Sequence, residues 1–141
     1  MRSQPQLRAL RRIQYLVCLW SGTLMMLLAI FVFATIPGEK GSDLTLGVSN
    51  EVPSVLFWKA GHLFGFALFA GFLTLAASAT FNQNIPGARI KAVVIIVGIL
   101  MAITTELLQS FVPGHIPAIY DIGIDVAGTA LGIKFAILWR K

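Results

Sequence analysis

Four apolar windows, each long enough to cross a lipid bilayer, dominate the sequence and restrict what it can fold into. They cover about residues 13–36, 55–79, 92–112 and 118–139 of the 141. A helix rises about 1.5 Å per residue, so roughly 20 apolar residues cross the hydrocarbon core. The windows predict an all-α, polytopic membrane protein with four transmembrane helices in one compact bundle.

The composition agrees with this class. Hydrophobic residues make up 57% of the chain and charged residues only 12%, whereas soluble domains contain roughly 25% charged residues. The first window is longer than the apolar core of a cleavable signal peptide, and no small-x-small cleavage site follows it, so we expect it to remain as a helix. Cys18 lies within that window and has no second cysteine for an internal disulfide.

The basic residues are unevenly distributed along the chain. By the positive-inside rule, both termini and the segment between the second and third windows are cytoplasmic. We therefore expect residues 1–12 to form a basic cytoplasmic segment, followed by a four-helix membrane domain over residues 13–141. The pI of about 9.9 then reflects topology and not nucleic-acid binding, and the expected location is the bacterial inner membrane, with the lipid bilayer as partner. Nine basic residues lie on the cytoplasmic side: Arg2, Arg8, Arg11, Arg12, Arg89, Lys91, Lys134, Arg140 and Lys141.

A group of polar residues interrupts the outward halves of the last three windows. At helical rise, His62, Glu106 and Asp125 all lie ~9 to 10 Å from the outer ends of their helices. Each polar residue also shares a helix face with a neighbour three or four positions away. Since a charge that faces lipid costs several kcal/mol, we expect these faces to meet inside the bundle. The candidate functional cluster is Lys59, His62, Glu106, Gln109, His115, Asp121 and Asp125.

Small residues continue the same faces below the polar group. Gly128 and Gly132 follow the small-xxx-small pattern, and Gly98 and Ala102 lie on the neighbouring helix. Such residues let helix backbones approach closely in membranes. We interpret all four as helix-packing positions.

The order and spacing of these motifs resemble the VanZ-like family of small bacterial membrane proteins over about residues 55–133. The motifs are KxxH at Lys59 and His62, ExxQ at Glu106 and Gln109, a Pro-Gly turn before His115, and the run Asp121, Asp125, Gly128 and Gly132. The resemblance implies an envelope protein associated with resistance to the glycopeptide teicoplanin, and it implies no settled biochemical activity.

Two positions depart from the family pattern, which typically has Arg where this chain has His115 and Asn where it has Asp125. Both departures make the cluster more negative. With Lys59 positive, three carboxylates negative and the histidines neutral, the net charge is about minus two. A buried excess of negative charge requires a bound proton, a bound cation or access for water.

Three hypotheses for the cluster remain open at this stage. It is a structural network that fixes helix register, in which Lys59 pairs with Glu106 or Asp121. Alternatively, it is an outward-facing site that binds or processes an envelope component, such as a peptidoglycan precursor or a glycopeptide. The third hypothesis is a membrane enzyme that acts on a lipid-linked or cell-wall substrate by acid/base or metal-assisted chemistry, with His62, Glu106 and Asp125 as candidate metal ligands. The chain lacks HExxH, GxSxG and phosphate-loop motifs, so the pattern specifies no reaction. We expect no cofactor, and a divalent metal belongs only to the third hypothesis.

Overall fold

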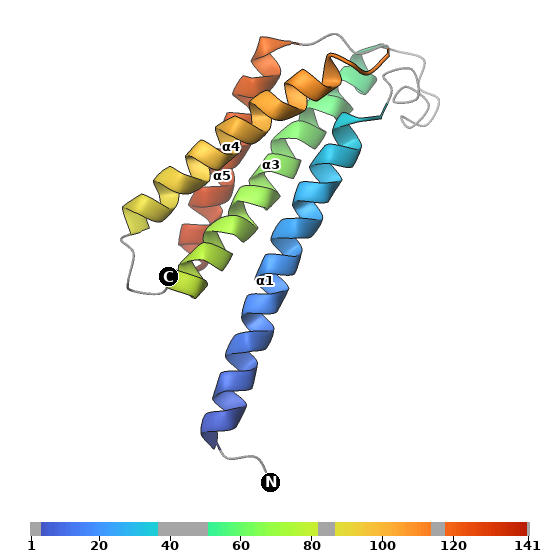
Figure 1. Ribbon diagram of the computed structural model, residues 1–141. Coiled ribbons are helices and arrows are strands. Elements are labelled where there is room, and N and C mark those ends of the chain that lie inside the picture. The colour runs from blue at the N-terminus through green and yellow to red at the C-terminus, as the bar shows by residue number, and fades with distance from the viewer. Residues whose placement is uncertain (1–3, 37–50, 82–86, 114–117, 141) are drawn as a thin grey trace.

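The computed structural model describes residues 4–36, 51–81, 87–113 and 118–140, with the backbone alone for residues 51–55. Within these ranges the chain contains four long helices and no strand. All four are long and apolar enough to cross a membrane. This confirms the predicted all-helical membrane architecture (Figure 1). The helices are α1 (Gln4–Ala34), α3 (Glu51–Phe81), α4 (Gly87–Gln109) and α5 (Ile119–Trp139).

The helices run antiparallel along one bundle, and α3 is its central element. Figure 1 shows that α1 begins and α5 ends toward the same end of the bundle, which we call the terminal end. The opposite end, where α1 and α4 end and α3 and α5 begin, is called the loop end. The largest helix interface joins α3 to α5, followed by that between α1 and α3. Helix α1 lies at the side of the bundle, and its first turns extend past the other helices (Figure 1).

Glycine residues of α5 allow its close contact with α3. A Cβ atom at Gly128 would come closer than 3.0 Å to the carbonyl oxygen of Leu63, and one at Gly132 equally close to that of Ala67. On α4, Gly98 makes room for the side chain of Thr129. Ala102 is fully buried. The four small residues therefore lie at helix contacts, and the two of α5 face α3.

Apolar side chains fill the space between the four helices. One buried cluster joins Ile30 of α1, Phe66 and Phe69 of α3, and Ala102 of α4. A second cluster lies nearer the terminal end and joins α3, α4 and α5; it consists of Ala70, Ile90, Val94 and Ile133. Leucine, isoleucine and phenylalanine residues cover much of the outer surface, as expected for helices that face lipid.

Helices α1, α3 and α4 each begin several residues before their apolar windows, and the end of α4 also differs. Helix α1 begins at Gln4, well before residue 13, because arginines favour helix as much as apolar residues do but end a hydropathy window. Helix α4 ends at Gln109, short of residue 112. The N–H groups of Phe111 and Val112 bond to carbonyls three residues earlier, which tightens the chain just before Pro113.

Candidate functional site

The core of the polar cluster is a contact between α3 and α5. His62 Nδ1 lies 2.9 Å from Asp125 Oδ1, and both side chains are buried, with 6% and 2% of their area exposed. The contact between Gly128 and the backbone of Leu63 adjoins this pair, because Gly128 lies one helical turn after Asp125 and Leu63 follows His62. The same glycine that brings the two helices together therefore brings the two side chains within hydrogen-bonding distance.

Gln109 extends the pair to α4. Its Nε2 lies 3.3 Å from His62 Nε2, and the whole residue is buried. With Gln109 as donor, His62 Nε2 accepts and Nδ1–H donates to Asp125, so the imidazole is neutral. The amide oxygen of Gln109 then has no partner among the described residues. With the amide reversed, this oxygen accepts from Nε2–H and the imidazolium donates to both neighbours.

Lys59 brings the cluster to the protein surface. Its ammonium forms an ion pair with Asp121 across the α3–α5 interface, and its side chain is 24% exposed compared with 8% for the aspartate. The ammonium also lies 3.9 Å from the centre of the Tyr120 ring, a cation–π distance. Of the two partners that the sequence allowed for Lys59, the structure selects Asp121. Tyr120 is absent from the predicted cluster, and its place beside Asp121 on α5 was the signal for this contact.

Glu106 has a different partner from those expected. Its carboxylate accepts a hydrogen bond from the backbone N–H of Ala118, the residue just before α5. The first N–H groups of a helix have no partner within the helix, and a negative charge is favourable at that end. Glu106 therefore joins the end of α4 to the start of α5. His115 lies outside the described residues.

The candidate metal ligands are all hydrogen-bonded to protein groups. His62 and Asp125 bond to each other and Glu106 bonds to Ala118. No group of three His, Cys, Asp or Glu side chains close enough to hold a metal ion occurs in the described part of the chain. A divalent metal stays a prediction, which metal analysis of the purified protein tests.

A groove between α3 and α5 adjoins the exposed part of the cluster. It has a volume of about 430 Å³, and its lining extends on α3 from Leu56 past Lys59 to Phe64 and on α5 from Tyr120 to Ala127. Gly123 lines the groove, and a Cβ atom there would meet no atom within 4 Å. The groove thus has Lys59 and Tyr120 toward its loop end, and the other residues that line it are apolar.

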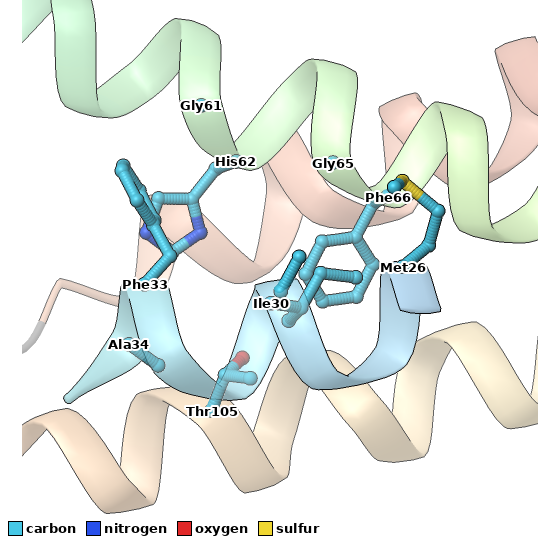
Figure 2. A pocket seen from close by; sticks show the side chains of 10 residues that line it. Met26, Ile30, Phe33, Ala34, Gly61, His62, Gly65, Phe66 and Thr105 are labelled. Carbon is cyan, nitrogen blue, oxygen red and sulfur yellow. The ribbon is translucent and has the colours of Figure 1, made fainter. Parts of the chain in front are cut away.

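A smaller cavity of about 160 Å³ lies on the other side of His62, between α1, α3 and α4. Figure 2 shows Phe33 beside the imidazole and Ile30, Phe66 and Met26 further along the cavity. The rings of Phe33 and His62 are 6.0 Å apart between centroids and meet edge to face. Gly61 gives Phe33 room to pack against α3. The cavity walls are almost entirely apolar, so the cluster has its polar opening on the Lys59 side.

Comparison with known protein families gives a match. The model of the VanZ/LLP1 family matches residues 13–140. The match covers nearly the whole chain and includes the first transmembrane helix, which the motif-based resemblance over residues 55–133 left out. No curated protein and no solved structure matches the chain.

Proposed function

The chain belongs to the VanZ/LLP1 family, and on this basis we propose that it is a multi-pass envelope protein whose α3–α5 groove binds a lipid-linked peptidoglycan precursor. The expected location is the bacterial inner membrane with both termini in the cytoplasm, because seven basic residues of the described chain lie toward the terminal end. The loop end, with the polar cluster and the mouth of the groove, then faces outward, where such precursors carry their polar headgroups. Teicoplanin tolerance is the expected effect in the cell.

The observation that carries the proposal is the position of Lys59 at the mouth of an apolar groove. Apolar side chains of α3 and α5 line the groove below it, including Leu63, Phe64 and Ile124. A lipid-linked precursor has the same two parts, a hydrocarbon chain and an anionic phosphate headgroup. The chain would lie along the groove and the phosphate would reach the ammonium.

Asp121 positions Lys59 for this role. An ammonium group has three N–H donors, and the ion pair with Asp121 holds the group at the mouth without occupying them all. Tyr120, which is 62% exposed, covers the same ammonium with its ring. Because the Lys59 side chain is 24% exposed, the ammonium can bind a phosphate oxygen in addition to these two partners.

The geometry supports binding over the enzymatic hypothesis. A general base needs a free ring nitrogen within hydrogen-bonding distance of its substrate. Both nitrogens of His62 face protein partners, Asp125 and Gln109, in a buried network. The network is better suited to holding α3, α4 and α5 in register behind the groove. The purely structural hypothesis accounts for this network but gives no role to the groove.

Drug susceptibility tests the proposal in cells. The protein is expressed in a teicoplanin-susceptible host beside an empty vector and the Lys59→Met variant, with membrane abundance matched by immunoblot. We expect the wild type to raise the inhibitory concentration of teicoplanin and Lys59→Met to lose this effect. Lys134→Met, a lysine of α5 outside the groove, is the control and should retain it. Equal susceptibility of all strains would remove glycopeptide tolerance from the proposed function.

A further inference from the structure

A second apolar groove lies at the terminal end of the bundle, away from the polar cluster. It is formed by the last turns of α3 and the first turns of α4 and has a volume of about 300 Å³. On α3 it extends from Leu73 to Phe81, and on α4 from Arg89 to Val97. Among the described residues that line it, Arg89 is the one with a charge. Val93 in the wall is 58% exposed, so the groove opens toward the lipid.

The length of the groove fits one leaflet of a bilayer. Leu73 and Phe81 are eight residues apart, as are Arg89 and Val97, which corresponds to ~12 Å of helix on each wall. The hydrocarbon core of one leaflet is ~15 Å thick, half of the ~30 Å of the whole core. The groove therefore starts at the level of Arg89 and reaches most of the way toward the middle of the bilayer.

No acidic side chain pairs with Arg89 in the described part of the chain. All six acidic residues lie elsewhere, in residues 39–51 or in the polar cluster at Glu106, Asp121 and Asp125. This end of the groove is therefore suited to binding an anionic group. An arginine in this position can bind two phosphate oxygens at once.

We propose that this groove binds an anionic phospholipid of the cytoplasmic leaflet, with one acyl chain between α3 and α4 and the phosphate on the Arg89 guanidinium. Basic pockets between transmembrane helices on the cytoplasmic side commonly bind anionic headgroups. The apolar wall alone accepts any acyl chain, so the preference for an anionic lipid comes from the arginine and the basic residues around it. This site is independent of the α3–α5 groove and of the function proposed for it.

Native mass spectrometry of the full-length protein in detergent tests this site. Phosphatidylglycerol and phosphatidylcholine with the same acyl chains are added in equal amounts, and the retained lipid is counted. We expect preferential retention of phosphatidylglycerol, reduced about fivefold by Arg89→Gln, since one basic residue contributes about 1 kcal/mol to such contacts. Arg8→Gln, which removes the same charge from α1 outside the groove, should retain the wild-type preference. Arg89→Lys keeps the positive charge and should bind at least half as much phosphatidylglycerol as the wild type.

A second pair of variants tests the apolar part of the groove. Ala77→Phe places a ring in it, whereas Ala130→Phe places the same ring on an exposed position of α5. We expect Ala77→Phe to lose lipid and Ala130→Phe to keep it, with melting temperatures in detergent showing that both are folded. Equal retention of the two lipids, or equal loss in Arg89→Gln and Arg8→Gln, would overturn the proposal. So would a dimer that excludes lipid, because a second copy would then cover the groove.

Discussion

His62 and Asp125 contact each other across the α3–α5 interface, with Nδ1 2.9 Å from Oδ1, although 63 positions separate them in the sequence. Their contact depends on Gly128, one helical turn after Asp125, which lets the backbone of Leu63 approach α5 closely. The small-residue face and the polar cluster are therefore parts of one helix interface. Substitutions in either part are expected to affect the other.

The first prediction concerns the hydrogen bond itself. Asp125→Ala leaves the buried His62 without its partner and should lower the free energy of unfolding by about 1–2 kcal/mol, the upper range for hydrogen bonds between membrane helices. Asp125→Asn keeps an oxygen that accepts from Nδ1–H and should lose less than half of that amount. Thermal unfolding in detergent measures both. Equal destabilisation by the two variants would show that the carboxylate charge, and not the hydrogen bond, stabilises the interface.

The second prediction concerns the close approach of α5 to α3. Gly132→Ala places a methyl group against the carbonyl of Ala67, and the helices must separate at a cost of about 1–3 kcal/mol. Gly123→Ala is the matched control, because a methyl group there meets no atom within 4 Å. We expect a lower melting temperature for Gly132→Ala alone. A loss of stability in both variants would point to glycine's backbone freedom and away from packing.

The third prediction concerns Glu106 and the start of α5. Glu106→Ala removes the acceptor for the N–H of Ala118 and should destabilise the first turn of α5 by about 1–3 kcal/mol. Glu106→Gln retains an acceptor oxygen and should have a smaller effect. Hydrogen exchange followed by mass spectrometry should show faster exchange at the start of α5 in Glu106→Ala, with little change at the far end of that helix. Unchanged exchange at Ala118 would contradict the assigned hydrogen bond.

The fourth prediction is that the losses of stability caused by substituting Lys59 and Asp121 are not additive. Lys59→Met leaves a carboxylate that is 8% exposed without its partner, and breaking a buried ion pair in this way costs about 3–5 kcal/mol. The double variant Lys59→Met/Asp121→Leu removes both charges and should be more stable than Lys59→Met alone. A double-mutant cycle in detergent measures the difference. A double variant as unstable as the sum of the two single variants would show that the residues are not coupled.

The sequence determines the number of helices and the common depth of the polar residues because both follow from hydropathy and helical rise. His62 and Asp125 were expected at one depth on inward faces, and they contact each other. Helix ends were less accurate, as for α1, because a hydropathy window ends at the first charges whereas the helix continues through them. The start of α5 at Ile119 agrees with the window within one residue, because Pro117 limits how early that helix can begin.

The pairing within the cluster was not determined by the sequence. A helical wheel gives the face of a residue but not the rotation of its neighbour, so Glu106 and Asp121 were equal partners for Lys59. The structure separates them because the side chain of Glu106 reaches the N–H of Ala118, while Asp121 lies directly across from Lys59. The two lipid-facing grooves were also unforeseen, since they depend on how far adjacent helices diverge.

The most direct test of the function proposed for the α3–α5 groove is binding of a lipid-linked peptidoglycan precursor to the purified full-length protein, measured by native mass spectrometry. Gly123→Leu fills the α3–α5 groove and leaves every residue of the polar cluster in place, and Ala130→Leu adds the same side chain on an exposed position of α5 outside the groove. We predict that the wild type and Ala130→Leu bind the precursor. Gly123→Leu and Lys59→Met/Asp121→Leu should bind at least tenfold more weakly, which corresponds to a loss of about 1.4 kcal/mol or more. Equal binding by all four proteins would contradict this prediction.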